Sequence, residues 1–183
     1  TWLVQRAFKC CFSDHITERL DQSGELDAAM VHQWAENNGN GLEKTLDMTD
    51  NVLGDGGAKG IAKLIAAENS SWTSINLSNS EIGDEGAKAI GKALEGNETL
   101  KNLNILGNTF GEKGAAALMP YYEIMRQTIE TSLGWKGVNS EEWNLSGKKL
   151  TDNDMLLIEP LLRTMPNLKE LNLGYNNIGD EGC

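Results

Sequence analysis

Residues 75–90 read INLSNSEIGDEGAKAI, and altered copies of this segment occur at four other places in the chain. Each copy has two apolar residues separated by one position, then a turn, then a third apolar residue. Side chains two positions apart lie on one face of a strand, so each copy predicts a short strand with one buried face. The first buried positions of the five copies are Leu46, Ile75, Leu103, Trp143 and Leu171.

The copies recur at a nearly constant interval. Counted from the second apolar position, Met48 to Leu77 is 29 residues, Leu77 to Ile105 is 28, and Leu145 to Leu173 is 28. The remaining step, from Ile105 to Leu145, is 40 residues, which is one repeat plus about twelve extra residues for a unit of this size. Such an interval predicts a stack of similar modules, because each module buries the apolar face of its neighbour.

A glycine pair and a helix follow the strand in most copies. The pairs are Gly54 and Gly57, Gly83 and Gly86, Gly111 and Gly114, and Gly179 and Gly182. Glycines at this spacing fit a tight turn that needs backbone freedom. In the second copy, Ala87, Ile90, Ala93 and Leu94 recur at intervals of three and four residues, which predicts a helix with one apolar stripe.

The pattern resembles leucine-rich repeats of the ribonuclease-inhibitor type, which occur in ribonuclease inhibitor, tropomodulins, Ran GTPase-activating proteins and NOD-like receptors. The resemblance implies an α/β solenoid, a curved stack with parallel strands on the concave face and helices on the convex face. We expect about five repeats in residues 41–183, with an insertion near residues 121–140 and a truncated last repeat, so that a longer chain or a partner covers the open end.

Two repeats depart from the pattern. The turn asparagine is Ser80 in the second repeat and Lys148 in the fourth, and Asp154 replaces the second glycine of the fourth. Serine substitutes in part for the asparagine, whereas lysine has no acceptor, so we expect a rebuilt turn in the fourth repeat. Pro120 and Pro160 lie in the helices of the third and fourth repeats, where they predict bent or restarted helices because proline lacks an N–H.

The first forty residues do not repeat. Residues 2–12 and 26–37 are predicted to form two helices that cap the open side of the first repeat. The turn at residues 21–27 is similar to the middle of an EF-hand loop, but the first and last ligand positions hold Arg19 and Met30. Two ligand carboxylates are therefore missing, and we expect a degenerate helix pair that packs without a metal ion.

Acidic residues outnumber basic ones by 27 to 16, which gives a net charge of −11. This charge argues against nucleic acid as a partner, because phosphate binding needs a cationic surface. A protein with a basic surface is favoured instead. No apolar run reaches the roughly 18 residues that a membrane span needs.

The acidic residues at the predicted helix starts have a structural explanation. Asp55, Asp84 with Glu85, and Asp180 with Glu181 each follow a turn glycine, where a negative charge meets the positive end of the helix dipole. No nucleophile motif, phosphate-binding loop or paired metal-ligand spacing occurs, and His15 and His32 lie far from the repeats. The sequence therefore predicts no enzyme, no cofactor and no metal site.

Cysteine usage indicates a reducing compartment. Cys10, Cys11 and Cys183 provide no framework of disulfides, and we expect an intracellular protein, cytoplasmic or within an organelle, that is not secreted. The glycosylation sequons that begin at Asn69, Asn97 and Asn144 argue the other way, although such triplets arise by chance in a repeat rich in Asn and Ser.

Residues between the buried strand positions are predicted to form a ladder across the concave face. Its central row is Asp47, Asn76, Asn104, Asn144 and Asn172. One flank is Thr49, Ser78, Leu106, Ser146 and Gly174, and the other is Thr45, Ser74, Asn102, Glu142 and Glu170. The aligned amides either bind a partner or hydrogen-bond along the ladder and solvate it, and the central row lacks the aromatic residues that binding hot spots favour.

The insertion is rich in bulky residues. Tyr122, Met125 and Ile129 have helical spacing, which predicts a helix that returns onto the array and a projecting loop at residues 133–137. Trp135 in that loop is a candidate docking residue if it is exposed, whereas packing against its own repeat is the alternative.

The sequence as a whole predicts a non-enzymatic protein-interaction module or scaffold, plausibly a subunit of a larger assembly. Two other functions share the implied architecture, a Ran-type GTPase activator and a tropomodulin-type actin-capping protein. Arg126 and Arg163 are the only arginines of the array, and both lie in the predicted insertion or helices, so the activator hypothesis has little support.

Overall fold

The computed structural model describes residues 44–67 and 70–179. The helical cap and EF-hand-like turn predicted in residues 1–40, both histidines and all three cysteines lie outside the described residues.

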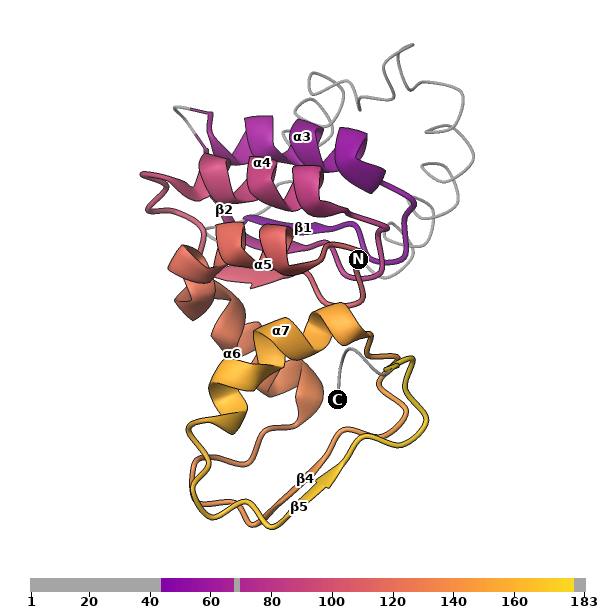
Figure 1. The fold of residues 1–183 in the computed structure, drawn as a ribbon. Helices are drawn as coiled ribbons and strands as arrows, with labels where there is room; N and C mark the ends of the chain where they lie inside the picture. Colours follow the sequence, from indigo (N-terminus) through magenta and orange to yellow (C-terminus); the bar gives the residue numbers. More distant parts are fainter. Residues whose placement is uncertain (1–43, 68–69, 180–183) are drawn as a thin grey trace, which may run out of the picture.

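Strands and helices alternate along the described chain, as the repeats predict (Figure 1). In order they are β1 Lys44–Asp47, α3 Gly54–Ile65, β2 Trp72–Asn76, α4 Asp84–Leu94, β3 Asn102–Asn104, α5 Glu112–Leu118, a 3-10 turn Met119–Tyr121, α6 Tyr122–Leu133, β4 Glu142–Asn144, α7 Asp152–Leu162 and β5 Glu170–Asn172. None of the described helices is long and apolar enough to cross a membrane.

The strands pair in parallel and in the register that the repeats predict. Ile75 of β2 pairs with Leu46 of β1 on one side and with Leu103 of β3 on the other. Trp143 of β4 pairs with Leu171 of β5 in the same way. Equivalent positions of neighbouring repeats therefore lie side by side, which confirms the strand assignment and the parallel arrangement.

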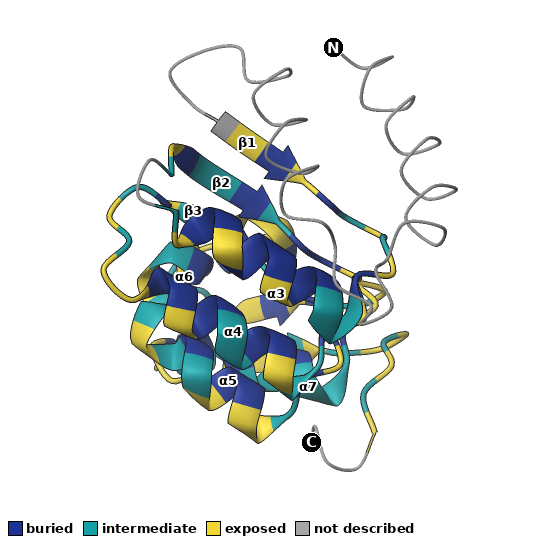
Figure 2. Cartoon of the chain, turned by 90° about the horizontal axis from the view of Figure 1, so that it is seen from above, coloured by how far each residue is buried: buried dark blue, intermediate teal, exposed yellow. Residues whose placement is uncertain are grey.

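The core lies between the strands and the helices (Figure 2). The second apolar position of each repeat points into it, because Leu77 and Leu145 are 0% exposed and Ile105 is 1% exposed. Leu173, the equivalent residue of the last repeat, is half-buried. In α4 the predicted stripe is confirmed, since Ala87, Ile90, Ala93 and Leu94 are all buried.

The sheet is interrupted, although the repeat pattern predicts one continuous sheet. β1, β2 and β3 form one sheet and β4 and β5 form another, so β3 and β4 do not pair. The expectation of one continuous ladder is therefore wrong between the third and fourth repeats. We call residues 44–118 the first block and residues 142–179 the second block.

The inserted residues explain the interruption. α6 packs against β3, and Met125, Ile129 and Leu133 on its inner face are buried. In Figure 1 this helix and α7 lie between β1 and β2 at the top and β4 and β5 at the bottom. The helix predicted from Tyr122, Met125 and Ile129 is thus confirmed. It packs against β3 and separates the two sheets.

The two helix prolines act differently. α5 ends at Leu118, a 3-10 turn carries Pro120, and α6 starts at Tyr122, so the restarted helix expected there is confirmed. Pro160 lies inside α7, which continues for two more residues to Leu162. Of the bent or restarted helix predicted there, the restart does not occur, because the proline is so near the helix end that few later turns depend on it.

Candidate interaction surface

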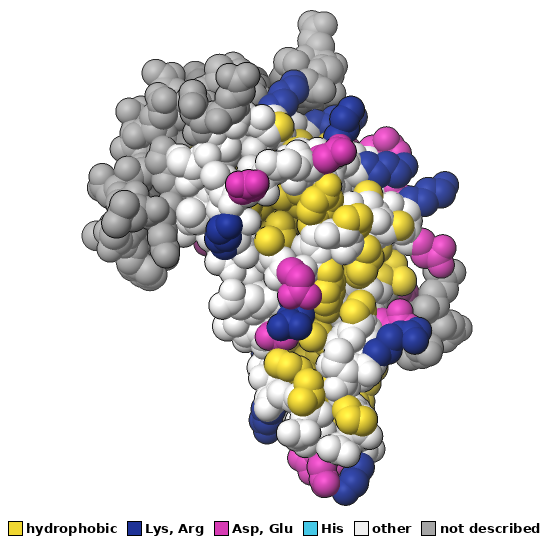
Figure 3. All heavy atoms as spheres, turned by 90° about the vertical axis from the view of Figure 1, so that its left-hand side faces the viewer, with side chains coloured by type: hydrophobic (Ala, Val, Ile, Leu, Met, Phe, Trp, Pro, Cys, Tyr) yellow, Lys and Arg dark blue, Asp and Glu magenta, His cyan; other side chains and the backbone are white. Residues whose placement is uncertain are grey.

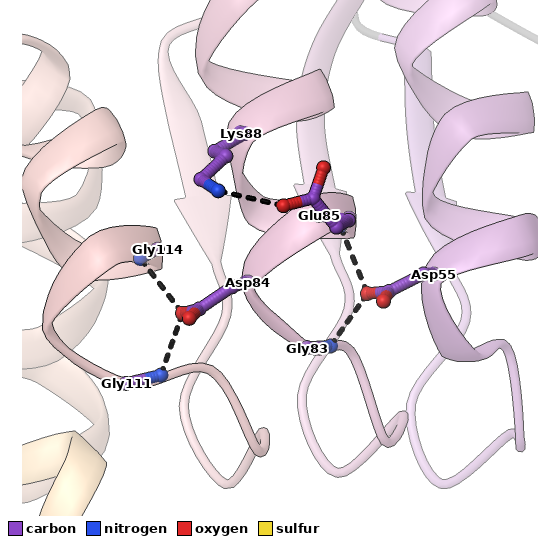
Figure 4. Close-up of polar contacts among 8 residues, drawn as sticks. Asp55, Gly83, Asp84, Glu85, Lys88, Gly111 and Gly114 are labelled. Atoms are coloured by element: carbon purple, nitrogen blue, oxygen red, sulfur yellow. Dashed lines mark hydrogen bonds and ion pairs between the residues drawn. The ribbon is translucent and has the colours of Figure 1, made fainter.

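Carboxylates of the first and second repeats hold the helix starts of the repeats that follow them (Figure 4). Asp55 Oδ1 accepts hydrogen bonds from the N–H groups of Gly83 and Gly86, at 2.8 Å each. Asp84 does the same for Gly111 and Gly114, at 2.9 and 2.8 Å. The second block repeats the contact, from the Gly179 N–H to Asp152 Oδ1 at 2.6 Å. Asp55 and Asp84 therefore bind the start of the neighbouring helix and also lie in the first turn of their own helix, the dipole position predicted from the sequence.

Close packing at this contact requires glycine. A Cβ on Gly86 would lie 2.8 Å from the Cβ of Ala58, from Asp55 Oδ1 and from Ile82 Cγ2. Since carbon atoms in contact lie at 3.5–4.0 Å, the second glycine of the Gly-x-x-Gly pair makes room for the carboxylate of the preceding repeat.

The turn asparagines form a second link between repeats. Asn108 is 1% exposed, and its amide donates to the carbonyls of Leu77 and Ile105 while its oxygen accepts from the N–H groups of Ser80 and Ile82. Asn176 makes equivalent bonds to Leu145, Leu173 and Leu150 in the second block. Ser80 replaces this link in part, because its hydroxyl donates to the Met48 carbonyl at 3.1 Å.

Neither link is present at the junction of the third and fourth repeats. The aspartate position there holds Glu112, which is exposed, and among the described residues its side chain makes no hydrogen bond to the fourth repeat. The asparagine position holds Lys148, which is also exposed and donates to the Ser132 carbonyl at the end of α6 at 3.4 Å.

Asp154 replaces the missing carboxylate at the start of α7. Its Oδ2 accepts from the N–H and hydroxyl of Thr151, at 2.8 and 2.9 Å, and its Oδ1 accepts from the Gly107 N–H of the third repeat at 2.7 Å. Burial raises the pKa of Asp154, while these hydrogen bonds act in the opposite direction. The sequence predicted a rebuilt turn in the fourth repeat. In the structure this turn leads into a capping box, in which Asp154 of α7 accepts from Thr151 at the start of the same helix.

Two further hydrogen bonds hold α6 to the second block. The Tyr122 hydroxyl donates to the Leu157 carbonyl of α7 at 3.2 Å, and burial raises the pKa of Tyr122 to about 12. The indole N–H of Trp143 donates to the Leu133 carbonyl at 3.2 Å. The insertion therefore connects the blocks in place of the missing repeat contacts.

The candidate site is the exposed side of the strands and their turns, which we call the strand face. It carries the predicted ladder, whose central residues share one local contact. Each side-chain oxygen accepts from the N–H two residues later: Asp47 from Thr49 at 3.1 Å, Asn76 from Ser78 at 3.2 Å, Asn104 from Leu106 at 3.2 Å, Asn144 from Ser146 at 3.0 Å and Asn172 from Gly174 at 3.0 Å.

This contact fixes the orientation of the four amides. Because the oxygen accepts from the backbone, the NH2 group is the part left for other partners. The described residues contain no acceptor that bonds to the NH2 groups of Asn76, Asn104, Asn144 or Asn172. Hydrogen bonding between neighbouring amides, one of the two alternatives from the sequence, is thus not seen within the described ranges, although on the flank the Ser78 hydroxyl donates to Thr49 Oγ1 at 3.5 Å.

Exposure differs between the blocks. In the first block Asn76 and Asn104 are half-buried, and Ser78 and Leu106 are only 9% and 7% exposed. In the second block Glu142, Asn144, Glu170 and Asn172 are all exposed, as is Gly174. Leu106 is therefore a core residue. Thr45 and Asp47 of β1 are exposed as well, so β2 and β3 form the least accessible part of the strand face, while the outward residues of β4 and β5 are exposed in both strands.

Trp135 is half-buried and packs against the core. Its ring nitrogen is buried and has no hydrogen-bond partner among the described residues. The loop that carries it projects less than the sequence indicated.

Tyr175 was not identified from the sequence. It is 95% exposed and has φ +59°, a left-handed conformation that is unfavourable for an aromatic residue. The same turn position in the other repeats has positive φ as well and holds Asp50, Asn79, Gly107 and Gly147. The signal was available in the sequence, because Tyr stands where the other copies have residues that tolerate this conformation.

Few other large apolar side chains are exposed. Hydrophobic side chains gather in a band down one side of the molecule, with charged side chains along its margins (Figure 3). Only Val52, Val138 and Tyr175 are exposed large hydrophobic residues in the described part of the chain, so the band consists mainly of the visible edges of half-buried side chains. No group of three or more His, Cys, Asp or Glu residues within the described ranges forms a potential metal site.

Comparisons with known proteins agree with this geometry. A family model described as Leucine Rich repeat matches residues 44–62, 68–91, 96–119 and 164–183. A human protein named "NACHT, LRR and PYD domains-containing protein 5" is 30% identical over 93 residues, which cover 51% of this chain and 8% of that protein. The human "NACHT, LRR and PYD domains-containing protein 14" is 26% identical over 137 residues, which cover 75% of this chain and 12% of that protein. The chain spans only a small part of these relatives.

Proposed function

Since this chain is a leucine-rich repeat protein, we propose that it is a non-enzymatic protein-interaction module, a curved solenoid whose strand face is the concave binding surface. Repeat proteins of this kind bind partners through extended concave surfaces. The ribonuclease-inhibitor type of repeat and a role as a scaffold or assembly subunit are part of this proposal.

The observation that carries the proposal is the set of unpaired amide donors on the strand face. In each strand from β2 to β5, the central asparagine uses its oxygen within its own turn, and its NH2 group has no partner among the described residues. The core does not need these amides, because the buried positions of the same strands are apolar. A row of oriented donors on a rigid sheet matches the carbonyl groups of a protein partner.

Site-specific photo-cross-linking tests the proposal. A benzophenone amino acid is placed at Asn76 or Asn144 on the strand face, or at Lys59 or Glu159 as matched controls, which are exposed on helices α3 and α7. The four variants are incubated with the same cell extract and irradiated. We expect cross-linked protein from the strand-face positions and none from the helix positions. Equal cross-linking from both sets, or cross-linking from the helices alone, would contradict the proposal.

A further inference from the structure

The two blocks differ in the chemistry of the strand face. At the amino-terminal end of each strand, the first block has the neutral residues Thr45, Ser74 and Asn102, whereas the second block has Glu142 and Glu170. At the left-handed turn position, the first block has Asp50, Asn79 and Gly107, whereas the second has Gly147 and Tyr175. Charge and an exposed aromatic ring therefore coincide only on the second block.

Glu142 and Glu170 lie opposite each other on neighbouring strands, and no described cation contacts them. Glu142 and Glu170 are partners across β4 and β5, and both are exposed. Like charges directly opposite each other destabilise a sheet. Lys169, which is next to Glu170, forms its ion pair with Glu141 at 2.8 Å, and no described cation contacts the side chain of Glu142 or Glu170. The pair is thus free to receive a positive charge from outside.

Tyr175 lies at the other end of the same surface. It follows β5 by three residues, next to the glycine turn of the preceding repeat, where Gly147 has no side chain to cover it. The path from Glu170 to Tyr175 is five residues, which is at most about 16 Å of extended chain. Between the two ends are the outward amides of Asn144 and Asn172.

We propose that Glu142, Asn144, Glu170, Asn172 and Tyr175 form a docking strip for an extended basic segment of a protein partner. The inference rests on the proposed function and names the partner chemistry of its surface. A Lys or Arg side chain of the segment lies between the two glutamates and removes their mutual repulsion. The amides donate to main-chain carbonyls of the segment, and the ring of Tyr175 covers an apolar or cationic side chain.

Charge complementarity favours a basic segment over an acidic or an apolar one at the docking strip. An acidic segment would add a third negative charge beside the glutamates, on a chain whose net charge is already −11. A purely apolar segment would leave the glutamates buried without a partner, which is costly. A basic segment avoids both penalties, and aromatic residues such as Tyr are frequent binding hot spots.

Peptide selection on the purified chain tests the strip. Phage that display random nonapeptides are selected on the immobilised protein, and the enriched sequences are measured as synthetic peptides by fluorescence anisotropy. We expect enrichment of peptides with at least one Lys or Arg, and an affinity that falls as NaCl is raised. Enrichment of acidic or neutral sequences, or no enrichment over a blocked surface, would overturn the inference.

Variants then assign the binding to the strip. E142T/E170N introduces the residue types of Thr45 and Asn102, and should weaken binding of the selected peptides about tenfold or more. The control E98Q/E112Q removes two exposed carboxylates from the first block and should leave the affinity unchanged. An equal loss in both double variants, or no loss in the first, would refute a specific strip.

Tyr175→Asn separates binding from folding. Asn tolerates the left-handed conformation that Tyr175 occupies, as Asn79 does with φ +54°, so the variant should melt at the wild-type temperature or above it while its peptide affinity falls about tenfold. Unchanged affinity, or a lower melting temperature, would contradict the role assigned to Tyr175. If a partner still cross-links to Asn76 while these variants bind peptides normally, the proposed function survives and the docking strip does not.

Discussion

Asp55 stabilises a helix that belongs to the next repeat. Its carboxylate accepts two backbone hydrogen bonds at the start of α4, where the N–H groups have no partner within the helix. The sequence placed an acidic residue at this position but not its partners, because the donors lie about 30 residues later and meet the carboxylate only once the repeats stack. An acidic residue at this position can therefore face its own helix start or the start of the next helix, and the structure shows hydrogen bonds to the next one.

Replacing Asp55 tests which contact matters. We expect Asp55→Ala to lower the free energy of unfolding by about 2 kcal/mol, because two charge-assisted hydrogen bonds to Gly83 and Gly86 are lost. Urea denaturation followed by circular dichroism measures the change. Glu85→Ala is the matched control, since Glu85 also lies in the first turn of α4 but is exposed and bonds only to Lys88. Its effect should stay below about 0.5 kcal/mol, and equal losses in both variants would mean that the hydrogen bonds to the next repeat add no stability beyond the helix dipole.

At the scale of an element, the start of α7 shows how an irregular repeat is stabilised. Glu112, Lys148 and Asp154 each depart from the repeat pattern, and all three lie where the third and fourth repeats would otherwise bond. Lys148 and Asp154 were recognised as departures in the sequence, where they predicted a rebuilt turn. The separation of β3 from β4 was not predicted, because it depends on where the α6 helix packs, and the periodicity of α6 defines its apolar face but not the strand that it contacts.

Asp154 also predicts a pH dependence of folding. Burial raises the pKa of Asp154 above its ordinary value, so the folded state binds a proton more tightly than the unfolded chain. The contribution of this group to stability is therefore full below a pH of about 4 and is lost as the pH rises through the folded pKa. Relative to Asp154→Asn, the wild type should lose free energy of unfolding as the pH is raised from about 4 toward 7.

Urea unfolding of both proteins across this pH range measures the difference. Asp154→Gly serves as a second reference, since it also removes the titrating group but leaves the Thr151 N–H without its acceptor. It should be less stable than Asp154→Asn at every pH while it shows the same trend against the wild type. A difference that does not vary with pH would contradict the raised pKa.

At the scale of the whole molecule, the described strands and helices share one hydrophobic core but form two sheets. Contact between the blocks runs through α5, α6 and α7, and through the bond between Asp154 and Gly107. A repeat array behaves as a set of units coupled by their interfaces, so an interface without strand pairing is expected to be the weakest one. The exposed strand face of β4 and β5 therefore lies on the block that is joined to the rest of the array by this weakest interface.

Hydrogen exchange tests this division. Met125 of α6 is 0% exposed, and Met125→Ala creates a cavity beside α6, the helix that connects the blocks, which costs about 2–5 kcal/mol for a buried residue of this size. We expect amide exchange in β4 and β5 to accelerate about tenfold or more, while exchange in β1 and β2 changes little, because local opening follows cooperative units. Mass spectrometry of peptic fragments resolves the two sheets.

Ile61→Ala is the matched control for the other block, since Ile61 of α3 is also 0% exposed. This variant should accelerate exchange in β1 and β2 and leave β4 and β5 near the wild-type rate, the reverse of the pattern for Met125→Ala. Equal acceleration of both sheets in both variants would mean that the described repeats open as one cooperative unit. In that case the missing strand pairing between β3 and β4 would be compensated fully by the helices that connect the blocks.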